Sequence, residues 1–195
     1  MSEISFLCGL GNPGEEFAST RHNLGFDTLD LLARRKKLGW KKKNGTALVC
    51  QWNCGSGKVV LIKPLTYMNL SARAFKFYPS ISEDSLLVIC DDINLPLGRL
   101  RIRNSGGSGG HKGLESISGY FANDGYARLR MGVGPSPSGE EWSDFVLAPF
   151  VGDERQIAGR MIEDAADAVE MIVRAGIEAA QEAFNKRSGS SDERV

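Results

Sequence analysis

The sequence predicts a single α/β domain, built on a mixed, largely parallel β-sheet with helices on both faces. Apolar strand-like runs alternate with helix-like segments, which favours a sheet covered by helices. The length of 195 residues, 42% of them hydrophobic, suits one domain with a substantial core. We place this domain at residues 1–187 and expect residues 188–195 to form a disordered tail, because they are small and polar.

The expected elements follow from local patterns along the chain. Apolar runs bounded by turn residues predict strands over 4–8, 46–52, 58–63, 85–90, 98–103 and 127–133. Helical spacing of apolar residues predicts helices over 23–37, 70–78, 112–121 and 153–184. Asn53-Cys-Gly-Ser-Gly57 is typical of a hairpin connection between the second and third strands. In such sheets ligands bind at the carboxyl ends of the strands, where the polar motifs of this chain begin.

Charge is balanced overall but unevenly distributed. Residues 1–103 carry 15 Lys and Arg against 9 Asp and Glu, and residues 104–195 carry the reverse. One face could therefore bind a polyanion although the net charge is zero. The basic cluster at 34–43 by itself is typical of a solvated helix end and loop. Arg99, Arg101 and Arg103 alternate along a predicted strand, which puts them on one face.

Cysteine usage and the N-terminus indicate a cytoplasmic protein. Cys8, Cys50, Cys54 and Cys90 form no C-x-x-C pair, so we expect free thiols in a reducing compartment. A zinc site at Cys50 and Cys54 is the weaker alternative, because no second ligand pair is in view. The first residues lack the layout of a signal peptide, and no apolar run approaches the roughly 20 residues of a membrane span.

The glycine-rich hexapeptide Gly9-Leu-Gly-Asn-Pro-Gly14 permits two interpretations. Its pattern G-x-G-x-x-G occurs in dinucleotide-binding turns, which would make the protein a nucleotide-dependent oxidoreductase. Such a turn must open a helix whose N–H groups bind the pyrophosphate. Pro13 lacks an N–H, Glu15 and Glu16 follow it, and the first predicted helix begins near residue 23. We therefore favour acid–base chemistry with His22, one of only two histidines.

Four segments together are more specific than any one of them. They are Gly9-Leu-Gly-Asn-Pro-Gly14 with Thr20-Arg-His-Asn23, Lys63-Pro-Leu-Thr-Tyr-Met-Asn-Leu-Ser71, Asp91-Asp-Ile-Asn-Leu-Pro-Leu-Gly98 and Gly106-Gly-Ser-Gly-Gly-His-Lys-Gly-Leu114. In this order and spacing they closely resemble the bacterial-type peptidyl-tRNA hydrolases over nearly the whole chain. The resemblance implies a cytoplasmic, usually monomeric esterase without metal, cofactor or obligate protein partner. Its substrate would be the acceptor end of peptidyl-tRNA, where it cleaves the ester between peptide and ribose.

The resemblance also implies roles for individual residues. His22 matches the catalytic histidine and Asp91 the carboxylate that orients it. Asn12 and Asn69 match substrate-binding amides, and Met68 matches a residue of the peptide groove.

Further matches concern the rim of the site. Phe17 and Lys112 stand where many members have Tyr and Asn; we expect both to contact substrate, but Lys112 replaces a neutral amide with a cation. Arg103 and Arg130 match basic residues that face tRNA phosphates, and Arg101 shares the predicted strand face of Arg103. For His111 a structural role and contact with the tRNA end are equally open.

The residue chemistry agrees with an esterase. A neutral imidazole can take a proton from water, a carboxylate on its other nitrogen fixes the tautomer, and amides can stabilise an oxyanion. No G-x-S-x-G elbow occurs, so direct attack by water is favoured over a covalent route through Ser19 or Thr20. A small-molecule ester is the alternative substrate. A metal at Asp91 and Asp92 lacks a suitably spaced partner.

Other interpretations stay open at this point. His22 could be an ordinary residue at a helix start, and Asn69 could cap the helix that follows it. The stretch 106–113 could be a plain connection or a clasp over a nucleic-acid end, and 135–141 could form a lid. The same fold also resembles plant organelle proteins that assist RNA splicing without hydrolase activity, so a binding module is the rival to an enzyme.

Overall fold

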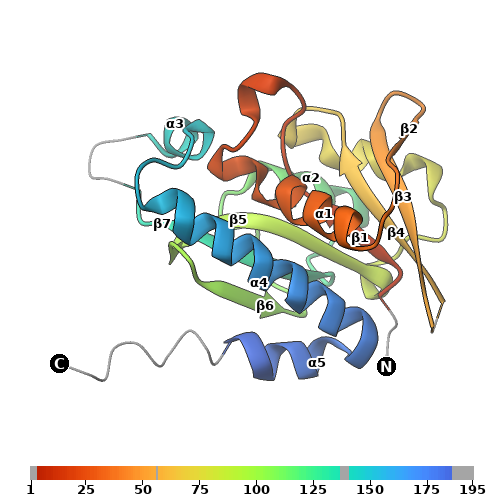
Figure 1. Cartoon of the computed structure of the whole chain (residues 1–195). Coiled ribbons are helices and arrows are strands. Elements are labelled where there is room, and N and C mark those ends of the chain that lie inside the picture. The colour runs from red at the N-terminus through yellow and green to blue at the C-terminus, as the bar shows by residue number, and fades with distance from the viewer. Residues whose placement is uncertain (1–3, 56, 137–140, 186–195) are drawn as a thin grey trace.

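A seven-stranded mixed sheet forms the centre of the protein (Figure 1). The computed structural model describes residues 4–55, 57–136 and 141–185. The strands are β1 (Phe6–Gly9), β2 (Lys41–Lys43), β3 (Ala47–Cys54), β4 (Gly57–Pro64), β5 (Leu86–Pro96), β6 (Leu100–Arg103) and β7 (Ala127–Gly134), in the spatial order β2-β3-β4-β1-β5-β7-β6. The four middle strands pair in parallel, whereas β2, β3 and β6 pair antiparallel at the two edges.

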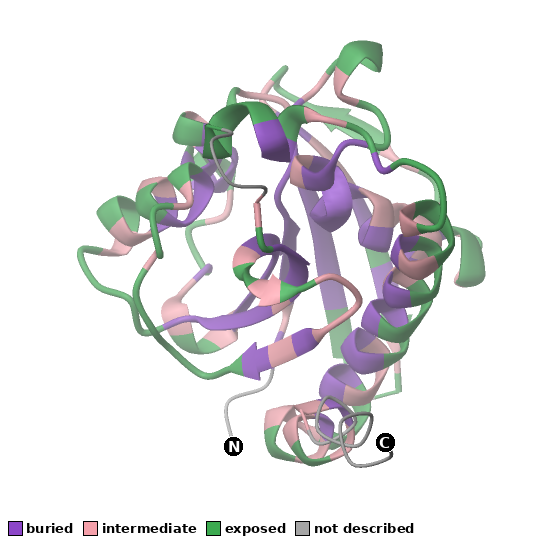
Figure 2. Cartoon of the chain, turned by 90° about the vertical axis from the view of Figure 1, so that its left-hand side faces the viewer, coloured by how far each residue is buried: buried purple, intermediate pink, exposed green. Residues whose placement is uncertain are grey.

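Helices cover both faces of this sheet, as the sequence predicts. The helices are α1 (Leu24–Arg35), α2 (Lys112–Phe121), α3 (Trp142–Leu147), α4 (Glu154–Ala175) and α5 (Ile177–Ala180), with the 3-10 segments η1 (Glu15–Phe17), η2 (Arg21–Asn23), η3 (Met68–Phe77) and η4 (Glu83–Ser85) and the π-helical turn η5 (Gln181–Asn185). One core lies between the sheet and α1 with α4, and a second lies between the sheet and η3 with α2. Figure 2 shows the buried residues concentrated in the strands and in the helix sides that face them.

The structure confirms the predicted fold class and corrects several elements. Helix 112–121 and the hairpin at 53–57 are found as predicted. The expected helix over 153–184 breaks at Gly176, whose φ of 91° is left-handed backbone that favours glycine. The segment predicted as a helix over 70–78 is a 3-10 segment, and β2 and α3 were not predicted. The expected tail, 188–195, lies outside the described residues. None of the described helices is both long and apolar enough to span a membrane.

The basic cluster at 34–43 has two different environments. Arg35 forms ion pairs with Glu163 and Asp167 of α4, and Lys36 Nζ lies 2.5 Å from Glu170. These pairs join α1 to α4, so this part of the cluster binds the acidic half of the chain itself. Lys41–Lys43 instead form the exposed edge strand β2, where charged side chains also discourage pairing with another sheet.

Two glycines let β1 and α1 approach closely. A Cβ on Gly9 would lie 2.3 Å from the Gly25 carbonyl oxygen, and one on Gly25 would lie 2.4 Å from the Leu10 nitrogen. Any side chain at either position would push the start of α1 away from the end of β1. Because η2 leads directly into α1, these glycines also set the position of His22 relative to β1 and β5.

A partly buried carboxyl in α1 gives a stability prediction. Burial, and to a lesser degree Asp30, raises the pKa of Asp27 to about 6, although Lys63 opposes the shift. A raised pKa in the folded state means that stability is greatest below the unfolded pKa of about 3.9 and falls until the pH passes about 6. Asp27→Asn should therefore raise the free energy of unfolding by about 1–2 kcal/mol at pH 8. Urea unfolding at pH 4 should show little difference, and equal stabilisation at both pH values would contradict this origin.

Candidate active site

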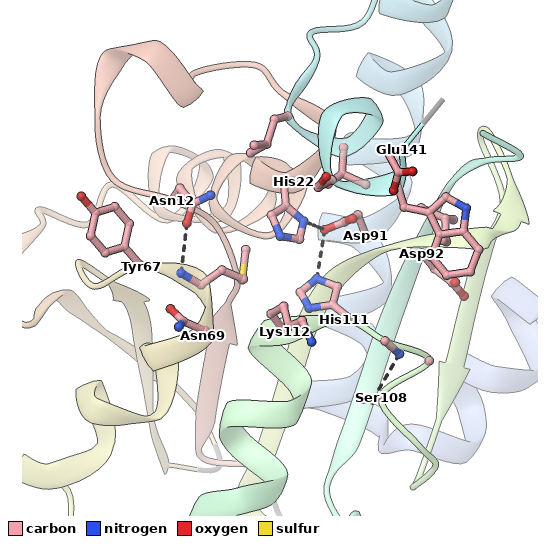
Figure 3. Close-up of a pocket in the computed structure, with 18 of the residues that line it drawn as sticks. Asn12, His22, Tyr67, Asn69, Asp91, Asp92, Ser108, His111, Lys112 and Glu141 are labelled. Carbon is pink, nitrogen blue, oxygen red and sulfur yellow. Dashed lines mark hydrogen bonds and ion pairs between the residues drawn. The ribbon is translucent and has the colours of Figure 1, made fainter. Parts of the chain in front are cut away.

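Polar residues from four parts of the chain meet at the carboxyl ends of the parallel strands. The turn after β1 carries Asn12, η2 carries His22, β5 carries Asp91, and the turn before α2 carries His111. They line one cavity of about 720 Å³ (Figure 3). Asp91 was expected just after its strand, but β5 continues through Pro96, with a register shift against β7 between Asp92 and Pro96.

The centre of the cavity is a carboxylate shared by two histidines. His22 Nδ1 lies 2.9 Å from Asp91 Oδ1, and His111 Nε2 lies 3.1 Å from the same oxygen. The Asp91 side chain is only 3% exposed, so this carboxylate is nearly removed from water. The two imidazole rings lie side by side, with centroids 4.8 Å apart. The sequence suggested only a structural or tRNA-contacting role for His111, whereas the structure brings it to the same oxygen as His22.

Hydrogen bonds determine which nitrogen of each imidazole donates, which accepts and which is left for a ligand. The backbone N–H of Gly113 donates to His111 Nδ1 at 3.1 Å. That nitrogen must therefore be the acceptor, and in the neutral ring the proton is on Nε2, which donates to Asp91. His22 contacts Asp91 through Nδ1, so its Nε2 is the nitrogen left for a ligand in the cavity. His22 is thus the imidazole that can exchange a proton with a bound molecule.

Asp91 is ionised throughout the neutral pH range. Burial by itself would raise the pKa of this carboxyl, but the charges and hydrogen bonds of His22 and His111 hold it well below its usual range. A buried carboxylate that accepts two N–H donors fixes the orientation of both rings. The same residue brings a negative charge to the centre of the cavity.

Asn12 is held by three hydrogen bonds. Its backbone N–H donates to Asn23 Oδ1 at 2.8 Å, and Asn23 Nδ2 donates back to the Asn12 carbonyl oxygen at 3.0 Å. The Met68 backbone N–H donates to Asn12 Oδ1 at 3.1 Å, as Figure 3 shows. Because the side-chain oxygen is used in this way, the Asn12 amide nitrogen is the group available as a donor to a ligand.

The other predicted substrate residues also line this cavity. Phe17, Met68, Asn69 and Lys112 all belong to its wall. Asn69 is exposed and lies inside the first turn of η3, whose N-cap is Tyr67, so Asn69 is not the helix cap. Lys112 is exposed and its Nζ lies 3.0 Å from Glu115 Oε2. The cation that replaces the family's amide thus already has a carboxylate partner one turn along α2.

The predicted tRNA residues divide between the cavity and the neighbouring strands. Arg130 lines the cavity, with its Nε 3.0 Å from Asp92 Oδ2. Arg101 stands opposite Arg130 in the β6–β7 ladder, and Arg103 stands opposite Arg128, but neither β6 residue lines the cavity. Arg103 is exposed and Arg101 is partly buried.

Several residues of the site were not assigned a role from the sequence. Asn23 holds the backbone of Asn12, and Tyr67 and Trp142 are exposed aromatics in the cavity wall. Asn23 and Tyr67 lie inside the quoted motifs, so their position was a usable signal. No pattern singles out Trp142. Residues 137–140 of the expected lid lie outside the described residues.

Two buried arginines hold the segments that carry His22 and His111. Arg21 Nη1 donates to the carbonyl oxygens of Ala148 and Pro149 at 3.1 and 3.0 Å, and its Nη2 pairs with Glu154 at 2.8 Å. Arg21 therefore ties the segment that holds His22 to the start of α4. Arg128 donates to the Gly107 carbonyl oxygen at 3.1 Å, which anchors the glycine-rich stretch that leads to His111.

The structure does not favour covalent catalysis by Ser19 or Thr20, or a zinc site at Cys50 and Cys54. Thr20 Oγ1 donates to the Phe17 carbonyl oxygen, and Ser19 lines a different pocket. Among the described residues, the one group of His, Cys, Asp and Glu side chains with metal-binding geometry is His22, Asp91 and His111, whose ligand atoms lie within 4.8 Å of one another. The sequence offers no suitably spaced partner for a metal at Asp91 and Asp92, whereas the fold brings two histidines to Asp91. The absence of a metal stays a prediction.

Known proteins resemble this chain over most of its length. The model of the family described as peptidyl-tRNA hydrolase matches residues 6–192. A peptidyl-tRNA hydrolase of Fervidobacterium nodosum is 42% identical over 179 residues, which cover 92% of this chain and 94% of that protein. One of Nocardia farcinica is 42% identical over 182 residues, covering 91% and 94%. The solved structure of peptidyl-tRNA hydrolase from Acinetobacter baumannii superposes with a TM-score of 0.87 at 32% identity, covering 95% of this chain and 96% of that one.

The protein is a carboxylic ester hydrolase with an α/β fold. Its sheet, its buried histidine–carboxylate centre and its relatives together define this class. The chain belongs to the peptidyl-tRNA hydrolase family. The enzyme interpretation is therefore confirmed over the binding module and the nucleotide-dependent oxidoreductase. The glycine hexapeptide agrees, since η1 follows it and the first α-helix begins only at Leu24.

Proposed function

We propose that this hydrolase uses His22 as the general base that activates water against the ester of peptidyl-tRNA, with Asp91 as the residue that orients it. The observation that carries the proposal is the 2.9 Å contact of His22 Nδ1 with a buried carboxylate, which leaves Nε2 for the cavity. The substrate is the acceptor end of peptidyl-tRNA, and the products are a free peptide and a reusable tRNA. We expect the enzyme to act as a cytoplasmic monomer without a cofactor.

The reaction needs two proton transfers: from water to His22, and then from His22 to the ribose oxygen. Water attacks the ester carbonyl carbon while His22 Nε2 takes its proton, and Asp91 stabilises the resulting imidazolium. The tetrahedral intermediate then breaks the bond to the ribose oxygen, which receives the proton back from His22. A shared Asp91 favours this cycle, because its second donor, His111, keeps the carboxylate fixed while His22 changes its charge.

Two amides of the cavity wall can bind the reacting carbonyl. Asn12 has its oxygen held by Met68, so its amide nitrogen is the donor for the developing oxyanion. Asn69 follows Met68 at the same end of η3 and lines the same cavity. Loss of one oxyanion donor typically lowers the rate by about 10²–10³. The roles of Asn12 and Asn69 are thus to position the ester and to support its negative charge.

The β6–β7 face supports an anionic partner. Arg101 and Arg103 lie directly opposite Arg130 and Arg128, so this edge of the sheet concentrates positive charge. A phosphate would be attracted to the exposed Arg103 and the partly buried Arg101, so we assign Arg101, Arg103, Arg130 and the nearby His111 to the tRNA end.

Arg103→Ala should weaken tRNA binding and reduce its salt dependence. Each lost phosphate contact lowers the log–log slope of affinity against salt by roughly one unit or slightly less. Hydrolysis of a small ester mimic should not change, since Arg103 is outside the cavity. The matched control is Lys58→Ala, an exposed cation at the start of β4. A salt slope that is the same in all three proteins would remove Arg103 from the interface.

The direct test of the function is release of tRNA from an N-blocked aminoacyl-tRNA by the purified protein with a chelator present. Release that the chelator leaves unchanged supports an esterase that needs no metal, and loss of that release in His22→Ala would add dependence on the histidine. Release that is lost with chelator and restored by a divalent cation would instead make His22, Asp91 and His111 a metal site. Release of product from a small ester but not from tRNA would point to a different substrate.

A further inference from the structure

A second groove lies outside the catalytic cavity, between η3 and α2. Its volume is about 670 Å³. Its wall includes two exposed cations, Arg73 and Lys76, and two exposed aromatic rings, Phe77 at 36% and Tyr120 at 48% exposure. None of the described residues that line it is acidic. An exposed surface that combines cations with aromatic rings suits a ligand that carries carboxylates and apolar side chains.

This groove lies next to the catalytic cavity, because η3 and α2 contribute residues to both. η3 begins in the cavity with Met68 and α2 begins there with Lys112, and both elements then lead away from it (Figure 3). Lys112, Ser116 and Tyr120 follow one another at intervals of four residues, so they lie along one face of α2. The Ala72 backbone N–H donates to Ser116 Oγ at 3.2 Å, which holds the two elements together on the floor of the groove.

The strand order indicates that the tRNA and the peptide lie on opposite sides of the catalytic centre. β7 and β6, which carry the arginines assigned to tRNA, lie on one side of β1 and β5, whereas β4, which contacts η3, lies on the other. In Figure 3 Tyr67 and Asn69 lie on the opposite side of His22 from Asp92. A substrate with its ester at His22 and its tRNA along β6 and β7 therefore has its peptide directed toward η3.

We propose that the groove between η3 and α2 binds the peptide part of peptidyl-tRNA and favours acidic and apolar residues several positions from the ester. The rise along α2 from Lys112 to Tyr120 is about 12 Å, which an extended peptide covers with about four residues. Arg73 and Lys76 would pair with the carboxylates of the peptide, and Phe77 and Tyr120 would contact its apolar side chains. This inference rests on the proposed function, because it needs the ester to be at His22.

The test compares a short and a long substrate. The short one is N-acetyl-aminoacyl-tRNA, which cannot reach the groove, and the long ones are six-residue peptidyl-tRNAs with either Asp or Lys at the positions farthest from the ester. The variant is Arg73→Gln with Lys76→Gln, and the control is Lys58→Gln with Arg160→Gln, which removes the same charge from exposed positions elsewhere. Thermal unfolding verifies that both variants are folded.

The wild type should prefer the acidic long substrate over the basic one. In the groove variant KM for the acidic substrate should rise about five- to tenfold, as expected for the loss of two partly exposed ion pairs. KM for the short substrate, and kcat for both, should stay within about twofold, and the control should behave as the wild type. A Tyr120→Ala variant should raise KM when the distal residues are apolar.

Each other outcome has a distinct meaning. Unchanged KM values for the long substrates would show that the groove does not hold the peptide. An equal rise for short and long substrates would indicate that Arg73 and Lys76 bind RNA, which overturns the inference. A wild type that is inactive on both substrates would overturn the proposed function itself, whereas activity on the short substrate without discrimination among the long ones rejects the groove alone.

Discussion

His22→Ala should lower kcat/KM for N-blocked aminoacyl-tRNA by about 10³–10⁴, because it removes the general base of the proposed reaction. The loss should be almost entirely in kcat, since the side chain contributes its proton transfer in the transition state. Single-turnover release of tRNA measures the chemical step directly. The fold should be preserved, because His22 is only partly buried and its neighbour Arg21 holds η2 in place.

The other histidine is the matched control for this prediction. His111→Asn removes a ring that contacts the same Asp91 oxygen, but whose Nε2–H is already committed to that contact. Its effect should be about 10- to 150-fold, smaller than that of His22→Ala, because a hydrogen bond to a charged group is worth about 1.5–3 kcal/mol. Equal losses in the two variants would contradict the assignment of His22 as the base. They would indicate instead that the two imidazoles act as a unit.

Asp91→Asn should lower kcat by about 10²–10⁴ with little change in overall structure. The amide has nearly the same shape, but it has no charge to stabilise the His22 imidazolium. If its NH₂ group faces His22, it also forces the ring into the tautomer whose Nε2 is protonated and cannot accept a proton. The measurement is kcat for tRNA release, compared with the wild type and with His22→Ala.

The same substitution has a second, independent readout in stability. The pKa of Asp91 is lowered in the folded protein, so its ionised form stabilises the fold above the unfolded pKa of about 3.9 and that contribution is lost as the pH falls below it. The difference in unfolding free energy between wild type and Asp91→Asn should therefore be present at pH 7 and shrink below pH 4. A difference that does not depend on pH would mean that packing, and not charge, explains the loss. Activity of Asp91→Asn close to that of wild type would contradict the orienting role.

The sequence predicted most of the sheet because six of its seven strands have a local signal of their own. The runs that became β1, β4 and β7 are apolar and bounded by turns, and helix 112–121 has clear amphipathic spacing. The edge strand β2 has no such signal, since its three residues, Lys41–Lys43, are charged and exposed. Gly176 was visible in the sequence, but the apolar spacing on both sides of it resembles one uninterrupted helix.

Long-range geometry limited the prediction of the site. His22 and Asp91 were identified because they lie in specific motifs, and the structure brings them into contact as expected. The contact between His111 and Asp91 was missed, because it depends on a glycine-rich turn whose path is set by Arg128 on another strand. The lengthening of β5 past Asp92 was missed for a similar reason, since it comes from pairing with β7.

The contacts that hold Arg21 join two segments that are synthesised at very different times. Its partners Ala148, Pro149 and Glu154 are 127 to 133 positions further along the chain, and its guanidinium also stacks on the Phe145 ring. Because translation runs from the N-terminus, the segment that fixes Arg21 is synthesised long after His22 itself. A chain that stops before Ala148 therefore contains His22, Asp91 and His111 but lacks the carbonyl groups that hold Arg21 beside His22.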